Sequence, residues 1–243
     1  VFSMCWSLEA SAALAVCGTA MTTYAAYTKK PKELWIPLGY FTAMEGLQAF
    51  QYVVVDLCGL PLNEVLTMAA YIHVAFQPFF INMIAMHFIP PKVRAKIAPC
   101  VYGLCGIAAA SILLQAYPFA WAGSCLEGMV MCGSPLCTTS GDWHLAWNVP
   151  YNGLTNFMVG IIPYMSIPGY TLVGMVLPFI YGSWKLNLYL ILVGPVVAWQ
   201  LTTNINEAVA IWCIFSIGIV MLVVDERLLR KYLYVKKWIF WKK

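Results

Sequence analysis

The chain has 243 residues, of which 62% are hydrophobic and only 10% are charged, and its mean hydropathy is +0.76. This balance excludes an ordinary soluble domain. The net charge of +4 is small and does not indicate nucleic-acid binding. The composition therefore predicts a polytopic membrane protein.

Seven apolar runs are long enough to cross a bilayer, which takes about 20 helical residues. They lie at residues 8–27, 34–56, 63–89, 95–116, 153–181, 186–202 and 207–224. We therefore predict an all-α fold in which residues 1–224 form a bundle of seven transmembrane helices. Splitting the fifth run at its prolines gives an eight-helix alternative, but this would place Lys185 and the basic C-terminal tail on the opposite side of the membrane from the other basic residues.

The basic residues orient the predicted bundle, because cytoplasmic loops collect Lys and Arg. All 14 Lys and Arg residues follow the first, third, fifth or seventh run, on one side of the membrane. The other side receives Asp56, Glu64, Glu127 and Asp142. We therefore predict that the N-terminus lies outside and the C-terminus inside, in a bacterial inner membrane or an organelle membrane.

Glu45 and His73 lie near the middle of the second and third runs, where an ionisable group is costly and usually has a partner. Gln48 lies one turn after Glu45, and Gln77 one turn after His73, so each helix presents a polar face. We predict that Glu45 and His73 form a coupled pair and are the candidate metal ligands. Together with Gln48, Gln77 and Gln200, they would line a pocket that opens outward.

Proline and glycine interrupt the third and fifth runs. Pro78 cannot donate to the carbonyl of Val74, so a kink is expected beside His73. The fifth run contains Gly160, Pro163, Pro168, Gly169, Gly174 and Pro178. In a membrane such residues indicate either broken helices over a cavity or a long, bent packing helix, and both interpretations remain open.

The connection at residues 117–151 is the one long loop between the predicted helices, and it is expected outside as a lid or plug. Five cysteines lie on this outer side, namely Cys5, Cys58, Cys125, Cys132 and Cys137. In an oxidising compartment they predict one or two disulfides, whose pairing the spacing leaves open. A zinc site built from Cys132, Cys137 and His144 is an alternative that lacks a fourth ligand.

The polar turn before the seventh run predicts a helix start, with Asn206 as the cap and Glu207 in the first turn. After this run, residues 225–243 form a basic amphipathic tail that we expect on the inner membrane surface, bound to anionic lipids. Its basic residues are Arg227, Arg230, Lys231, Lys236, Lys237, Lys242 and Lys243.

Four motifs together resemble a known family. They are Met-Cys-Trp-Ser at 4–7, Trp-Ile-Pro-Leu-Gly-Tyr-Phe at 35–41, His-Val-Ala-Phe-Gln-Pro-Phe-Phe-Ile-Asn at 73–82 and Trp-His-Leu-Ala-Trp at 143–147. This combination is similar to an uncharacterised, largely bacterial family of seven-helix membrane proteins with a domain of unknown function. The resemblance covers nearly the whole chain and implies no activity.

Several functions remain compatible with these residues, although a microbial-type retinal protein is excluded because the seventh run has no Schiff-base Lys. The polar pocket would bind or pass a small polar ligand, a proton or a metal ion. Alternatively, the protein is a non-catalytic accessory subunit of a photosynthetic or respiratory membrane complex, with His73 or Gln77 ligating a pigment or haem. A membrane-embedded metal-dependent hydrolase is a third possibility, although His73 is the one His at membrane depth.

Overall fold

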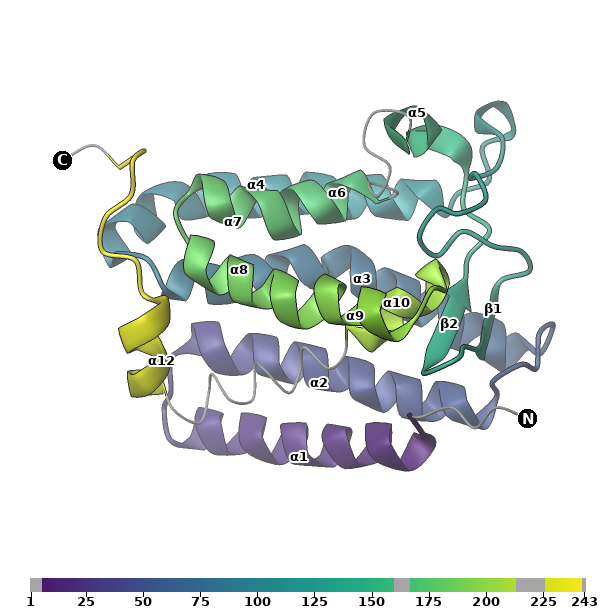
Figure 1. Ribbon diagram of the computed structural model, residues 1–243, viewed down its shortest axis with the longest axis horizontal. Helices are drawn as coiled ribbons and strands as arrows, with labels where there is room; N and C mark the ends of the chain where they lie inside the picture. Colours follow the sequence, from purple (N-terminus) through teal and green to yellow (C-terminus); the bar gives the residue numbers. More distant parts are fainter. Residues whose placement is uncertain (1–5, 160–166, 213–225, 242–243) are drawn as a thin grey trace.

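The computed structural model describes residues 6–159, 167–212 and 226–241. Four long helices form the first half, α1 (Leu8–Tyr27), α2 (Lys32–Val53), α3 (Pro61–His87) and α4 (Pro91–Gln115). Figure 1 shows them running alongside two shorter helical rods. The first rod consists of α6 (Pro168–Tyr170), η3 (Thr171–Val176) and α7 (Leu177–Ile180). The second consists of α8 (Trp184–Ile191), η4 (Leu192–Val196) and α9 (Val197–Leu201), and α10 (Ile205–Ile211) follows it.

These helices coincide with the first six apolar runs and with the start of the seventh. Within the described residues, three helices are long and apolar enough to cross a membrane: Pro61–His87, Pro91–Gln115 and Trp184–Leu201. Pro168–Ile180 is a shorter apolar helix. The fold is therefore mainly helical with candidate membrane spans. Most of the predicted seventh span, residues 213–224, lies outside the described residues.

Proline and small polar residues fix several helix starts. Pro61 and Pro91 occupy the first positions of α3 and α4, where the missing N–H is not needed. The prediction that Asn206 caps the last helix is wrong, because Asn204 accepts the N–H of Asn206 at 3.0 Å and so caps α10. The Asn206 amide instead donates to the carbonyl of Cys132 at 3.1 Å, a long-range contact that the local sequence does not reveal.

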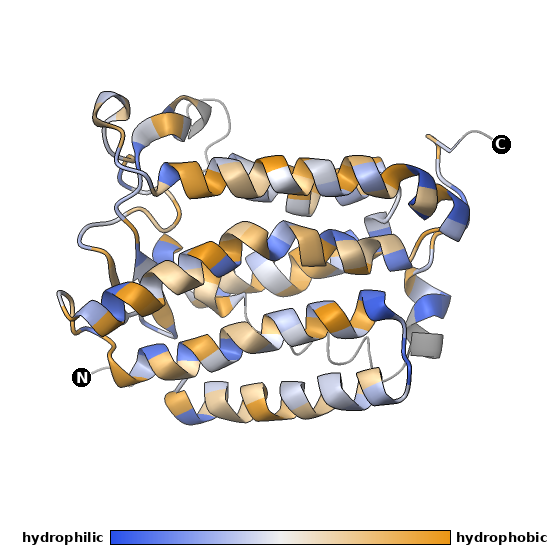
Figure 2. Cartoon of the chain, turned by 180° about the vertical axis from the view of Figure 1, so that it is seen from behind, coloured by the Kyte–Doolittle hydropathy of each residue, from blue (hydrophilic) through white to orange (hydrophobic). Residues whose placement is uncertain are grey.

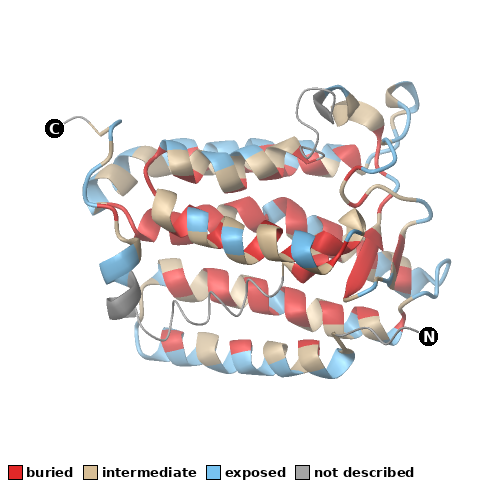
Figure 3. Cartoon of the chain, viewed as in Figure 1, coloured by how far each residue is buried: buried red, intermediate tan, exposed pale blue. Residues whose placement is uncertain are grey.

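Close helix packing builds the bundle around α3. Gly18 lies directly against Thr42, so that a side chain at this glycine would collide with the threonine. This contact brings α1 close to α2, as the small residues of the first run lead one to expect. The middle helix, α3, contacts α2, α4 and the first rod, and Figure 3 shows buried residues concentrated along it. The interior of the bundle therefore lies around α3.

Residues 117–155 fold into a structure that we call the outer cap. It contains η1 (Ala120–Ala122), η2 (Gly153–Thr155) and an antiparallel hairpin of β1 (Cys137–Ser140) and β2 (Leu145–Asn148), and the short α5 (Asn156–Val159) follows it. The hairpin lies at the end of the bundle where α2 ends and α3 begins (Figure 1). Buried polar side chains fasten it there: Thr138 contacts Gln51 at 3.0 Å and Thr67 at 2.7 Å.

Four of the five candidate cysteines form two disulfides. Cys58 pairs with Cys137, which joins the α2–α3 connection to β1, and Cys125 pairs with Cys132 inside the outer cap. The zinc alternative is wrong, because Cys132 and Cys137 are each bonded to another cysteine. Cys5 lies outside the described residues.

The C-terminal tail contacts the opposite end of the bundle from the outer cap (Figure 1). Its helix α12 spans Glu226–Leu233. Beyond this helix, the N–H of Val235 donates to the carbonyl of Phe88 at 2.9 Å, and the Trp238 indole donates to the carbonyl of Ile180 at 3.0 Å. Figure 2 shows hydrophobic residues along the helices and hydrophilic segments at their ends. The two ends of the bundle therefore differ in chemistry: a disulfide-bonded cap at one and a basic tail at the other.

Candidate functional site

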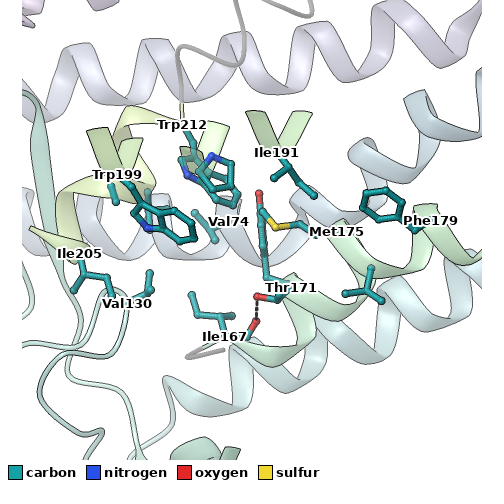
Figure 4. Close-up of a pocket in the computed structure, with 15 residues that line it drawn as sticks. Val74, Val130, Ile167, Thr171, Met175, Phe179, Ile191, Trp199, Ile205 and Trp212 are labelled. Atoms are coloured by element: carbon teal, nitrogen blue, oxygen red, sulfur yellow. Dashed lines mark hydrogen bonds between the residues drawn. The ribbon is translucent and has the colours of Figure 1, made fainter. Parts of the chain in front are cut away.

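A cavity of about 330 Å³ lies between α3, the two rods and α10 (Figure 4). Its walls are almost entirely apolar or aromatic. They consist of Val74, Val130, Ile167, Tyr170, Thr171, Met175, Val176, Phe179, Ile191, Pro195, Trp199, Ile205, Ala208, Val209 and Trp212. The volume lies at the lower end of the range for small-molecule sites, about 300–1,000 Å³. This cavity is the candidate functional site.

Two π-helical segments flank the cavity, and each supplies residues to its wall. Thr171 and Met175 come from η3, and Pro195 comes from η4. A π-helical turn is rare and is frequently found at functional sites. Pro178, just after η3, and Pro195, within η4, cannot donate to the carbonyls four residues back, which favours such irregular turns. The described part of the fifth run, residues 168–180, is therefore irregular helix beside a cavity, whereas Gly160 and Pro163 lie outside the described residues.

One of the polar residues predicted from the sequence, Gln77, contacts a residue of the cavity wall. The Tyr170 hydroxyl donates to Gln77 Oε1 at 2.8 Å, and Gln77 is 8% exposed. The Tyr170 ring also lies 5.5 Å from the Trp212 ring, centroid to centroid. Tyr170 thus joins a polar side chain of α3 to an aromatic side chain at the end of α10, along one edge of the cavity.

The other predicted site residues lie elsewhere. The His73 ring stacks on Tyr40 at 3.9 Å, and its Nε2 atom lies 2.9 Å from the Tyr40 carbonyl oxygen. His73 borders a second, open cavity of about 770 Å³. Glu45 and Gln48 are buried on α2, whereas Gln200 is exposed on α9. The five predicted residues therefore do not share one pocket in the described part of the chain.

The predicted pairing of Glu45 with His73 has no support from the described contacts. Tyr40 lies opposite His73, and Gln51 donates to the carbonyl of Leu66 at 3.1 Å. This antiparallel register puts Glu45 level with about Ala70, and on a different side of α2 from Tyr40. The coupled pair stays a prediction.

A buried carboxylate joins the outer cap to the helix that forms one wall of the cavity. Glu207, in the first turn of α10, is fully buried and accepts the N–H groups of Trp143, at 2.5 Å, and of His144. The Thr202 hydroxyl donates to the same carboxylate at 2.5 Å. The position of Glu207 in a first helical turn predicted a local role, but its contacts with the N–H groups of residues 142–144 of the cap depend on the tertiary fold.

His144 is buried beside this contact. The Leu145 N–H donates to His144 Nδ1 at 2.8 Å, and the Tyr52 hydroxyl lies 2.8 Å from the same atom. Nδ1 is therefore an acceptor, and the ring is neutral with its proton on Nε2. Burial lowers the pKa of His144 to about 3, because the charged imidazolium would lose its hydration there.

The comparisons with known proteins identify the family. A family model described as a family of unknown function (DUF5765) matches residues 9–234. The chain belongs to the DUF5765 family. This confirms the expected membership in an uncharacterised family with a domain of unknown function. No curated protein and no solved structure matches the DUF5765 chain.

The residues that line the cavity of this DUF5765 protein were not found from the sequence as a site. Tyr170, Trp199 and Trp212 are uncharged, so the cost of burying an ionisable group does not point to them. The sequence features that could have indicated this cavity were the proline and glycine residues of the fifth run, together with Pro195. In the described part of the chain, no three His, Cys, Asp or Glu side chains are placed to hold a metal ion.

Proposed function

We propose that this protein is an integral membrane protein with seven transmembrane helices that binds a small, largely apolar molecule in the cavity between α3, the two rods and α10. The observation that carries the proposal is the apolar and aromatic lining of this cavity, beside two π-helical segments. Ligand sites are commonly cavities of this kind, with a few polar groups that fix the ligand's orientation.

The proposed orientation places the outer cap outside and the tail inside. Disulfides form in oxidising compartments, and both disulfides lie at the cap end. Lys236 and Lys237 are exposed at the other end, where they would contact anionic headgroups of the inner leaflet. The side chain of Arg227 and residues Lys242 and Lys243 lie outside the part of the chain that is described.

A binding experiment with the purified protein tests the proposal. Ala208 lines the cavity and is 8% exposed, so Ala208→Phe should fill part of the space. We expect this variant to lower the affinity for butylbenzene, measured by calorimetry in detergent, by at least tenfold. Ala110→Phe, the same change at an exposed position of α4, is the matched control and should bind as the unaltered protein does. Equal binding by both variants would rule out this cavity as the site.

The second cavity favours a second candidate function, that of an accessory subunit of a larger membrane complex. Its walls include His73 and the aromatic side chains of Tyr40, Phe76, Phe79 and Tyr102. An open, aromatic surface of this kind suits the flat ring of a pigment or haem. The visible absorption spectrum of the gently solubilised protein tests this candidate: a pigment or haem band would support it, and a spectrum with protein absorption alone would count against it.

A further inference from the structure

An aromatic cluster lies exposed on the outer cap, directly after α4. The Tyr117 ring lies 4.7 Å from the Phe119 ring, and the Phe119 ring lies 5.5 Å from the Trp121 ring, centroid to centroid. Tyr117 is 60% exposed and Trp121 is 76% exposed, whereas large aromatic side chains are usually well buried. The described part of the chain leaves these rings uncovered, and an exposed apolar patch of this kind indicates a contact surface.

The cluster begins where an exposed apolar stripe of α4 ends. Leu104, Ile107 and Leu114 are exposed along this helix, on neighbouring turns of one face. Tyr117 follows Leu114 by three residues and continues the stripe. The Asn152 amide donates to the carbonyls of Leu114 at 2.8 Å and of Tyr117 at 2.6 Å, which fixes Tyr117 at the end of the helix. Because α4 is a candidate membrane span, the cluster continues a surface that would face lipid.

The short helix α5 adds a fourth exposed ring to this part of the cap. The Asn156 amide donates to the carbonyl of Ser124 at 3.0 Å, which holds the start of α5 against the turn that follows Trp121. Phe157, the next residue of α5, is 68% exposed. Figure 1 shows α5 beyond α4, on the side away from α3. We call Tyr117, Phe119, Trp121 and Phe157 the outer shelf, because this part of the cap projects sideways from the bundle.

Charge and length favour a membrane over a protein as the partner of the outer shelf. Residues 97–126 contain no Asp, Glu, Lys, Arg or His. Tyr117 follows Lys96, the last basic residue before it, by 21 residues. This separation is about 30 Å along a helix and matches the thickness of the hydrocarbon core of a bilayer. With Lys96 at the inner boundary, Tyr117 and Trp121 lie at the outer boundary, where Tyr and Trp are enriched in membrane proteins.

We propose that the outer shelf docks onto the outer leaflet of the membrane, with its rings at the boundary between phospholipid headgroups and acyl chains. An apolar ring with a polar O–H or N–H group suits this boundary, because one part of it meets hydrocarbon and the other meets water. The contact would hold the outer cap at a fixed depth beside α4. This inference rests on the membrane arrangement in the proposed function, and it adds a lipid contact outside the helices.

Quenching of tryptophan fluorescence tests the inference in the full chain, reconstituted into phosphatidylcholine vesicles. The contribution of Trp121 is the difference in emission between the unaltered protein and Trp121→Phe, a change that keeps an aromatic ring at this position. Two quenchers are compared, namely phosphatidylcholine brominated on its acyl chain near the headgroup, and iodide dissolved on both sides of the membrane. The brominated lipid should quench the Trp121 contribution at least about twice as strongly as iodide does, because the ring lies among the acyl chains.

A tryptophan introduced into the Trp121→Phe protein extends the test to two further positions. Phe157→Trp, on the outer shelf, should respond to the brominated lipid as Trp121 does. Asp142→Trp, at an exposed acidic position of the outer cap, is the matched control and should be quenched by iodide instead. Quenching of Trp121 by iodide alone, or by neither quencher, would overturn the inference, because the ring would then face water or a protein. Failure of the unaltered protein to float with the vesicles would instead reject the membrane arrangement in the proposed function.

Discussion

The Glu207 carboxylate accepts the N–H of Trp143 at 2.5 Å, across the junction between α10 and the outer cap. Asp142 and His144 donate their N–H groups to the same carboxylate. Glu207→Gln would place an amide NH₂ group against these donors, so we expect the protein to lose about 3 kcal/mol of stability through unsatisfied hydrogen bonds. Thermal unfolding measures this loss, and Glu127→Gln, at an exposed position of the outer cap, should have little effect. Equal melting temperatures for the two variants would contradict the described contact.

The stability of the outer cap should depend on pH through His144. The pKa of His144 is about 3 in the folded protein and should be close to the ordinary value of about 6.5 in the unfolded chain. The unfolded chain therefore takes up the proton first as the pH falls. The contribution of neutral His144 is fully present above about pH 6.5 and should be lost at up to about 1.4 kcal/mol per pH unit between pH 6.5 and pH 3.

Melting temperatures of the unaltered protein and of His144→Gln, measured from pH 7.5 to pH 4, check this dependence. Glutamine does not titrate in this range, so the variant should show a shallower fall in melting temperature. Parallel curves for the two proteins would mean that another group causes the dependence on acid.

The two disulfides should contribute unequally to stability. Cys58 and Cys137 are separated by 79 residues, whereas Cys125 and Cys132 are separated by seven. In the chain-entropy account, closing the longer loop stabilises the folded state by about 4.5 kcal/mol and closing the shorter one by about 2.5 kcal/mol. The double variant Cys58→Ser/Cys137→Ser should therefore melt at a lower temperature than Cys125→Ser/Cys132→Ser. Adding a reductant to the unaltered protein should lower its melting temperature below that of either variant.

The helices could be predicted from the sequence more readily than the contacts between them. Apolar runs of about 20 residues located α1 to α4 and the second rod, because a run of this length can form one continuous helix. The direction in which Glu45 or His73 points depends on the rotation of each helix about its axis. A shift of one position along a helix changes this direction by about 100°. That rotation is set by packing, such as the stacking of Tyr40 between His73 and Phe80.

The cavity and the outer cap also could not be predicted from the sequence, because both depend on contacts between several elements. Pro178 indicated irregular helix in the fifth run, but the enclosed space exists only because the two rods and α10 meet α3. The cysteine count predicted disulfides, yet the pairing of Cys58 with Cys137 follows from the position of β1 over the α2–α3 connection. Local sequence describes each element, whereas these sites are formed by several elements together.

The contact between Tyr40 and His73 yields a last prediction about helix register. The Tyr40 hydroxyl donates to the His73 carbonyl at 2.6 Å, and the ring of His73 is bonded to the Tyr40 carbonyl. His73→Phe keeps a ring that can stack on Tyr40 but removes the bond from Nε2, so we expect a loss of about 1 kcal/mol, measured by thermal unfolding. Because Glu45 points to another side of α2, the losses caused by His73→Phe and Glu45→Gln should add within about 0.5 kcal/mol in the double variant. A coupling energy above about 1 kcal/mol would instead restore the predicted pairing of Glu45 and His73 and would require α2 to be rotated relative to α3.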